Sequence, residues 1–443
     1  MSINFLIYAS IILFNYIKNN EVIIPFKSTL STISKNLSPM DFMSSLINNE
    51  LYINLNIGNP PQNLDFLLDF NLFHTYIIKD NNKNKNYKRF NHNISTTFRY
   101  IGKKDYFHNL GFFSAINSSD IITINDNLKN FNYTFFYLID LAPATSDKYP
   151  GIIGFGVVPN GQPFYYVTGI IYQLKQKNIT NNYIYTLVYN KNDYNGKIII
   201  GKNIHDNYSA DNFMEDYCLI TSFNFYYWGW NYITSYLDLE QLNITQIYFK
   251  PELGVIVLNN KIKDIIKNKY FIEKIEEGKC FEDYNKKYSF FYCDKDITIN
   301  IGKFNFINSN KGIEFSLEKN DLILEYNNKI FLLIVFDIHL LDNEAYFGYP
   351  FFKKFDVIFN QDTKTVGFYK NIKNEKKDNK EENNKTYENI KFEKNNNLLK
   401  KLVPFFVFLC GLFVLYLVFY IYRKIKRKTN EKLFEELNGE IND

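Results

Sequence analysis

Apolar residues between Leu51 and Lys370 come in short runs of strand length, and few windows show the rhythm of an amphipathic helix. Turn residues such as Gly58-Asn59-Pro60-Pro61 separate the runs. We therefore predict a mostly β architecture with few helices, for which Tyr165–Lys177 and Asn260–Lys269 are the candidates. The clearest predicted strands are Leu51–Ile57, Phe66–Phe70, Gly196–Ile200 and Phe331–Phe336.

One apolar run near the C-terminus is much longer than a strand. Leu402–Tyr422 contains 21 residues without a charge, which is enough to span a hydrocarbon core of ~30 Å as a helix. Five basic residues lie within residues 423–428, whereas only Lys400 and Lys401 immediately precede the run. The excess of positive charge predicts a transmembrane helix over 402–422 with a cytosolic tail at 423–443.

A second apolar stretch lies at the N-terminus, within residues 1–20. Ile3–Ile17 is short for a membrane span and has the length of the apolar region of a signal peptide. No Lys or Arg precedes it and no small-x-small cleavage site follows, so an uncleaved N-terminal anchor remains the alternative. With a cleaved signal peptide the chain is a single-pass type I protein of a secretory or cell-surface membrane, with its large domain lumenal or extracellular.

The amino-acid composition distinguishes a folded region from the segments attached to it. The chain has 443 residues, 46% of them hydrophobic, which suits a large two-lobed unit with additional segments. Residues 371–399 are charged and Asn-rich with little apolar content, which predicts a flexible polar stalk. The net charge of +4 comes from local excesses in the loop 79–93 and beside the C-terminal apolar run, so no nucleic-acid-binding face is expected.

The four Cys and five His residues form no cluster with metal-ligand spacing. Cys410 lies inside the C-terminal apolar run. Cys280 and Cys293 lie close together in the sequence and would form a disulfide in a secreted chain, leaving Cys218 over. Neither a nucleophile elbow nor a phosphate-binding loop is present, so no other enzyme class is supported. We expect no metal and no cofactor.

Residues Tyr52–Gln62 read YINLNIGNPPQ, and the next apolar run ends in Asp69-Phe70-Asn71. This arrangement resembles the first-lobe entry of pepsin-like aspartic proteases, including the plasmepsins, in which the next strand ends in a catalytic Asp-Thr-Gly. By this resemblance Asp69 matches the first catalytic Asp, while Phe70 and Asn71 replace the Thr and the Gly.

Further motifs of the same family follow in the same order and extend the resemblance over about residues 51–370. It implies a bilobal fold with a central cleft, an N-terminal lobe at 48–218 and a C-terminal lobe at 219–370. Tyr100 is the candidate for the flap Tyr that contacts substrate. The other matching segments are Asp120–Ile122, Gly151–Gly156, Gly196–Gly201, Tyr227-Trp228, Tyr346–Phe352, Asp356–Asn360 and Val366–Phe368.

The second catalytic motif should lie about twenty residues after Trp228, where the sequence is Ile247–Leu258, IYFKPELGVIVL. Matching the apolar strand puts Lys250 at the position of the second catalytic Asp. Matching the glycine instead makes Glu252-Leu253-Gly254 the degenerate motif. We prefer the first register because the strand then stays apolar up to the motif, and neither register supplies an Asp.

The family's chemistry needs two carboxylates that share one proton around a water molecule. Lys250 beside Asp69 would favour the ionised carboxylate and remove the shared proton, and Glu252 would displace the second carboxylate by about an ångström, which can cost ~10²-fold in rate. We therefore predict a catalytically impaired family member that binds a peptide or protein ligand in its cleft. The alternative is an active endopeptidase that uses an atypical Asp69/Glu252 pair.

Overall fold

The computed structural model describes residues 21–34, 36–80, 88–107, 113–124, 131–140, 148–158, 169–190, 193–202, 213–218, 220–222, 225–285, 287–308 and 313–369. Strands dominate these residues, which confirms the mostly β prediction. The predicted N-terminal segment, stalk, transmembrane helix and tail lie outside them. No helix within the described ranges is both long enough and apolar enough to cross a bilayer.

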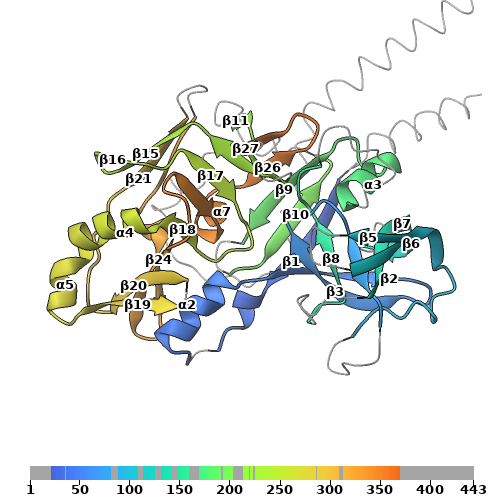
Figure 1. The fold of residues 1–443 in the computed structure, drawn as a ribbon, viewed down its shortest axis with the longest axis horizontal. Coiled ribbons are helices and arrows are strands. Elements are labelled where there is room, and N and C mark those ends of the chain that lie inside the picture. The colour runs from blue at the N-terminus through green and yellow to red at the C-terminus, as the bar shows by residue number, and fades with distance from the viewer. Residues whose placement is uncertain are drawn as a thin grey trace, which may run out of the picture. The chain divides into compact units, whose positions relative to one another are not determined.

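Most of the first half of the chain folds into one 13-stranded sheet (Figure 1), in the order β11-β27-β26-β9-β10-β1-β2-β3-β8-β4-β7-β6-β5. The last two strands of the described chain, β26 and β27, pair with β9 and β11, so the two predicted lobes share this sheet. The strands are β1 (Val22–Ser28), β2 (Leu51–Ile57), β3 (Gln62–Asp69), β4 (Tyr76–Ile78), β5 (Arg99–Phe107), β6 (Phe113–Thr123), β7 (Phe131–Asp140), β8 (Gly151–Gly154), β9 (Ile184–Tyr189), β10 (Gly196–Ile200), β11 (Phe213–Tyr217), β26 (Val357–Asn360) and β27 (Thr365–Tyr369).

The second half forms an eight-stranded sheet in the order β14-β17-β25-β18-β24-β20-β19, with β23 paired to β24. A four-stranded sheet, β16-β15-β21-β22, and a two-stranded sheet, β12-β13, complete it. The strands are β12 (Ile220–Ser222), β13 (Phe225–Tyr227), β14 (Gly229–Asn231), β15 (Ile233–Leu237), β16 (Glu240–Leu242), β17 (Gln246–Phe249), β18 (Ile256–Asn259), β19 (Cys280–Asn285), β20 (Tyr288–Asp294), β21 (Phe304–Asn308), β22 (Ile313–Leu317), β23 (Ile323–Tyr326), β24 (Lys329–Asp337) and β25 (Glu344–Phe347).

Helices are short and lie between strands. The first predicted helix is α3, which covers Ile170–Gln176 and begins after Gly169, whose backbone is extended. Residues 159–168 lie outside the described residues. The second begins at Asn260 as predicted but continues through a π-helical turn into α5. The helical elements are a 3-10 turn (Thr29–Thr32), α2 (Pro39–Ile47), α3, α4 (Asn260–Ile266), the π turn (Lys267–Phe271), α5 (Ile272–Glu276), α6 (Lys319–Leu322) and α7 (Tyr349–Lys354).

Helix α2 was not predicted, although its start is encoded locally. The Ser38 hydroxyl accepts a hydrogen bond from the Asp41 N–H, and Pro39 occupies the first helical position. The buried face of α2 packs on the second sheet, where the ring of Phe42 stacks on Tyr326 with centroids 3.8 Å apart. Figure 1 shows α2 beside β19 and β20, so a segment that precedes the first lobe is attached to the second.

The two halves repeat one local topology. In the first half β3 and β8 run parallel, β4 and β7 run parallel, and β4 and β8 pair antiparallel. In the second half β17 and β25, β18 and β24, and β18 and β25 form the same three pairings. Because the topology repeats, each residue at the C-terminal end of β3 has a structural equivalent at the C-terminal end of β17.

Cys280 and Cys293 form a disulfide that joins β19 to β20, which confirms the predicted pair. Cys218, the cysteine left over, is free and buried. Cys410 lies outside the described residues.

Candidate functional site

Asp69 is the last residue of β3 and lies opposite Gly154 of β8. Its Oδ1 accepts hydrogen bonds from the N–H groups of Asn71 (2.7 Å) and Leu72 (3.0 Å). Its carbonyl oxygen accepts a third from the Phe155 N–H, at 2.7 Å. The carboxylate is thus held by the turn that follows its own strand.

The pairing of β17 with β25 identifies the equivalent position in the second half. Gly154 and Gly348 correspond, because a Cβ at the first would meet the carbonyl oxygens of Leu72 and His74, and a Cβ at the second would meet those of Leu253 and Val255. Two residues before these glycines, Ile152 lies opposite Leu67, which is two residues before Asp69, and Tyr346 lies opposite Tyr248. Lys250 follows Tyr248 by the same two residues. By this correspondence Lys250 is the equivalent of Asp69.

The same correspondence pairs the residues that follow. Phe70 is equivalent to Pro251, and Asn71 is equivalent to Glu252. Polar side chains therefore stand at both positions where the family motif has Gly. We call Asp69, Asn71, Lys250 and Glu252 the junction cluster, because two members come from each half of the chain.

Lys250 reaches across the junction to Asn71. Its Nζ donates a hydrogen bond to the Asn71 Oδ1, and it also lies over the ring of Tyr227, 5.0 Å from the centroid. The pKa of the Tyr227 hydroxyl is raised, first by burial and then by the charge of Asp69. The ammonium is therefore held between an amide oxygen and an aromatic face.

Glu252 completes the junction cluster. Its pKa is raised chiefly because burial disfavours the charged form, and Asp69 adds to this effect. Lys250 and a hydrogen bond from Asn71 act in the opposite direction. Its Oε2 is buried and has no hydrogen-bond partner among the described residues.

Residues before Leu51 hold the turn that carries Glu252 in place. The Asn49 side-chain amide donates to the carbonyl oxygen of Glu252 at 2.8 Å, and its Oδ1 accepts from the Ser28 hydroxyl at 2.6 Å. The Gly254 N–H donates to the carbonyl of Leu46, at the end of α2, at 2.8 Å. A Cβ at Gly254 would lie 2.7 Å from that carbonyl oxygen, so the close approach requires glycine.

Phe70 and Pro251 fill the two positions where the family motif has Thr. Phe70 is 1% exposed and packs against Phe155 and Tyr185, with centroids 5.8 and 6.5 Å away. The carbonyl of Pro251 accepts a hydrogen bond from the Tyr189 hydroxyl at 2.7 Å. Neither side chain carries a hydroxyl that could tie the two turns together.

A family model described as eukaryotic aspartyl protease matches residues 50–371, more than half of the chain. The chain belongs to the eukaryotic aspartyl protease family. No curated protein matches it in a sequence comparison.

In this aspartyl protease family member the candidate flap residue Tyr100 lies on β5 and is 54% exposed. Its ring packs edge-on against Phe98, with centroids 4.9 Å apart, and lies near His92 and Tyr137. The following residues of the hairpin, 108–112, lie outside the described residues. The substrate-binding role of Tyr100 stays a prediction.

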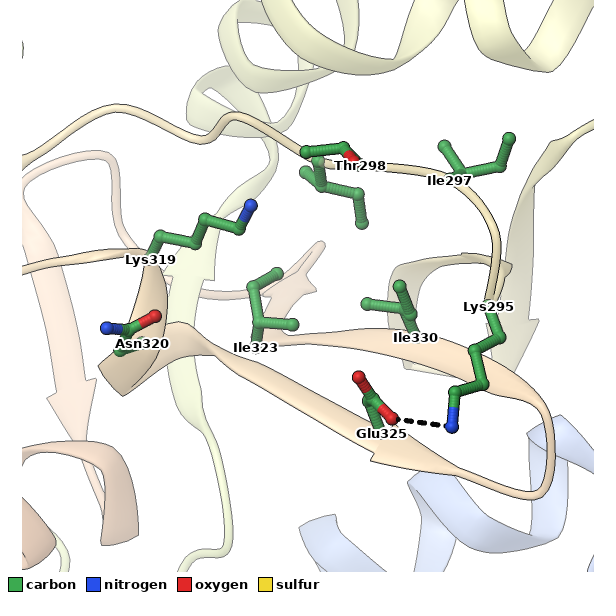
Figure 2. Close-up of a pocket in the computed structure, with 9 residues that line it drawn as sticks. Lys295, Ile297, Thr298, Lys319, Asn320, Ile323, Glu325 and Ile330 are labelled. Carbon is green, nitrogen blue, oxygen red and sulfur yellow. Dashed lines mark ion pairs between the residues drawn. The ribbon is translucent and has the colours of Figure 1, made fainter. Parts of the chain in front are cut away.

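A cavity of about 390 Å³ lies away from the junction cluster, on the second half of the aspartyl protease domain (Figure 2). Ile297, Ile323 and Ile330 contribute its apolar wall, and the Lys319 side chain reaches into it. Its one carboxylate, Glu325, pairs with Lys295 at 3.0 Å. No predicted site residue lines it, and the described part of the chain contains no group of His, Cys, Asp and Glu that could hold a metal ion.

The raised pKa of Glu252 gives a pH-dependent prediction. Above about pH 4.5 the unfolded chain loses this proton while the folded chain keeps it, so folding stability falls as the pH rises through the folded pKa. Glu252→Gln should therefore gain stability relative to the wild type as the pH rises from about pH 4.5 through the folded pKa of Glu252. Chemical denaturation of both proteins at several pH values measures the difference.

Glu277→Gln is the control for this titration. Glu277 has a lowered pKa, first because of its hydrogen bond to Lys279, so its replacement should give no such gain with rising pH. If the difference in the free energy of unfolding between the wild type and Glu252→Gln stays the same across the pH range, the raised pKa of Glu252 is contradicted.

Sequence reasoning identified Asp69, Lys250 and Glu252 as candidates but missed the contact between Asn71 and Lys250. It treated Asn71 only as a lost glycine. The two polar residues at the Gly positions of the paired motifs, Asn71 and Glu252, were a signal that polar side chains from the two halves meet there. The bracing by Asn49 was missed as well, because the residues before Leu51 match no motif of the catalytic lobes.

Proposed function

We propose that this aspartyl protease family member is catalytically impaired and acts as a peptide- or protein-binding module on a membrane. The observation that carries the proposal is the equivalence of Lys250 to Asp69, together with the hydrogen bond from Lys250 to Asn71. An ammonium in place of the second carboxylate supplies no partner to share the proton of Asp69.

Peptide binding does not need the catalytic pair. The family's cleft takes an extended chain through backbone hydrogen bonds, and this mode of recognition depends on strand geometry and side-chain pockets. A ligand in this protein would meet the ammonium of Lys250 near the centre of the cleft. We therefore expect a preference for ligands with an acidic or strongly polar group at that point.

Purified protein incubated with unfolded protein at mildly acidic pH should show no cleavage that a transition-state-mimicking aspartic protease inhibitor blocks. Asp69→Ala should leave this baseline unchanged, because a lone carboxylate cannot act as both general acid and general base. The appearance of peptide fragments over time is the measurement. Inhibitor-sensitive cleavage that disappears in Asp69→Ala would overturn the impaired-enzyme proposal.

A second candidate function is supported by Glu252. Its raised pKa favours a protonated carboxyl that interacts with Asp69, and an unequal pair of carboxyls is what aspartic protease chemistry uses. In this reading the protein is an endopeptidase with an Asp69/Glu252 pair. Cleavage lost in both Asp69→Ala and Glu252→Gln, but kept in Lys250→Gln, would favour this candidate.

We propose that Leu402–Tyr422 holds the chain in a secretory or cell-surface membrane in type I orientation. The support is the length of the uncharged run and the basic residues that follow it. A chain ending before Asn371 should be released from the membrane fraction into the soluble fraction, whereas the full chain should resist extraction with carbonate. A truncated product that stays membrane-bound would contradict a single C-terminal anchor and favour an uncleaved N-terminal one.

A further inference from the structure

The chain contains Asn-x-Ser/Thr motifs that the proposed function does not use. In a lumenal or extracellular domain, the Asn of this motif is the acceptor for N-linked glycosylation. The transferring enzyme reads the motif in the chain, whereas the folded domain accommodates the bulky product only where the Asn side chain points into solvent. Among the described residues the motif begins at Asn36, Asn93, Asn117, Asn132, Asn178 and Asn243.

Three of these motifs lie in exposed loops and have a free Asn side chain. Asn93 lies in the turn before β5, Asn178 follows α3, and Asn243 follows β16. Each of these side chains is exposed and has no hydrogen-bond partner among the described residues. A sugar attached to any of them would therefore displace no contact of the fold.

Local backbone structure fixes each of the three loops. The N–H of Asn93 donates to the Asn91 Oδ1 at 3.0 Å. Asn178 has a φ of 55°, a left-handed conformation that Asn tolerates better than most residues. Ile244 is fully buried, while its neighbours Asn243 and Thr245 are both exposed. The outward direction of the acceptors is thus a property of the folded loops.

Asn117 is the opposite case, because it lies in β6, which pairs with both β5 and β7. Its Oδ1 is buried without a hydrogen-bond partner among the described residues. A Cβ at Gly102 of β5 would lie 3.1 Å from the Asn117 Cβ, so the two strands are closely packed here. A glycan on Asn117 would require the strands to separate, and the folded protein should not contain one.

The two remaining motifs are exposed but restrained. In the motif of Asn36, the Ser38 that completes it is followed directly by Pro39, which restricts the Ser38 backbone. The motif of Asn132 lies inside β7, where Tyr133 is fully buried. The inference is therefore limited to the three loop motifs, since surface loops are where glycan acceptors are expected.

We propose that Asn93, Asn178 and Asn243 carry N-linked glycans. The inference rests on the proposed type I orientation, which puts these loops on the lumenal side. In the reaction the Asn Nδ2 loses a proton and bonds to the anomeric carbon of an oligosaccharide, while the bond from that carbon to a lipid-linked diphosphate breaks. One C–N bond forms, one C–O bond breaks, and no oxidant or reductant is needed.

The glycan on Asn93 lies beside the candidate flap. The ring of the preceding residue, His92, lies 6.1 Å from the ring of Tyr100. Ile94, the residue that follows, is 51% exposed. A bulky, water-soluble sugar at this turn covers an apolar side chain and restricts the approach of large ligands to β5 from this side.

Peptide mapping of the full chain, produced in a eukaryotic cell and purified in mild detergent, tests the three sites. Peptide-N-glycosidase converts a glycosylated Asn to Asp, and in heavy-oxygen water it labels that Asp. Residues 93, 178 and 243 should be read as labelled Asp, and Asn117 should remain Asn. A folded chain without these labels would overturn the proposal, and a label at residue 117 would contradict the structural reason for choosing the sites.

Five variants separate use of the motif from other changes in mass. Asn93→Gln and Asn243→Gln should each remove the mass of one glycan, and Asn178→Asp should do so with a residue that also tolerates positive φ. Thr245→Ala should remove the glycan from Asn243 without changing that residue, whereas Thr245→Ser should keep it. Asn320→Gln is the matched control, because Asn320 is exposed but outside any motif, and it should leave the mass of the glycans unchanged. A glycan that persists on Asn243 in Thr245→Ala would contradict the assignment.

Protease protection in sealed microsomes distinguishes this inference from the proposed orientation. If the domain is protected but the three Asn residues carry no glycan, the type I orientation stands and the glycan proposal is wrong. If an added protease digests the domain from outside and no glycan is found, both are wrong. Protection together with labels at the three positions is the expected result.

Discussion

Replacing Lys250 with Asp should create inhibitor-sensitive cleavage of unfolded protein at mildly acidic pH, about 10²-fold or more above the wild type. The substitution puts a carboxyl at the position equivalent to Asp69, where two carboxyls can share one proton. It also removes the ammonium that contacts Asn71. Phe70 and Pro251 still stand where the family motif has Thr, so the gain should stay well below the rate of an intact family enzyme. Release of peptide fragments with and without inhibitor is the measurement.

Lys250→Asn is the control for this gain of activity, because it removes the amine and has nearly the shape of Asp but no carboxyl. It should remain as inactive as the wild type. A folded Lys250→Asp protein with no more activity than Lys250→Asn would contradict the equivalence of Lys250 to Asp69. Equal gains in both variants would instead point to Glu252 as the second carboxyl.

Replacing Trp228 with Ala should lower the free energy of unfolding by about 3–5 kcal/mol, a large part of the ~5–15 kcal/mol that a domain has. Trp228 is 1% exposed, and its ring packs on Phe359 and Tyr185 at 5.2 and 6.4 Å between centroids. Its indole N–H donates to the carbonyl of Phe155 at 3.2 Å. Its own carbonyl accepts from the N–H of Phe249, the residue before Lys250. Denaturant unfolding followed by circular dichroism measures the loss.

Trp228→Phe separates packing from the hydrogen bond. Phe keeps an aromatic ring but cannot donate to Phe155, whose carbonyl still accepts from the Tyr185 hydroxyl at 3.0 Å. The loss should therefore be clearly smaller than for Ala, near the ~1 kcal/mol of one hydrogen bond plus the cost of the smaller ring. The second tryptophan, Trp230, is fully buried and can report unfolding by fluorescence in both variants. An Ala variant as stable as the Phe variant would show that the ring contributes little.

Strand positions were predicted well because each strand carries its own pattern. Leu51–Ile57 and Gly196–Ile200 have the predicted bounds, since turn residues flank each run. Helix α2 was missed because its nine residues form one buried face only against the second sheet. Its capping residues, Ser38 and Asp41, were a local indication, but a short isolated helix has little stability of its own.

The candidate site, like the fold, was predicted from the sequence only in part. The sequence identified Asp69 from the motif around it and limited its partner to Lys250 or Glu252. It preferred Lys250 because the strand then stays apolar up to the motif. The contacts at this position depend on the pairing of β17 with β25, which lies almost a hundred residues further along the chain. Strand pairing of this range is a tertiary property.

The sequence by itself determined the family, the mostly β character and the disulfide between Cys280 and Cys293, because these depend on ordered motifs, local patterns and a close pair of residues. It also supplies the physical case for the anchor at Leu402–Tyr422, which rests on length and charge alone. Only the tertiary structure brought Asn71, Lys250 and Glu252 into one cluster. Their contacts join turns from opposite halves of the chain, and no local pattern records which side chains meet across such a junction.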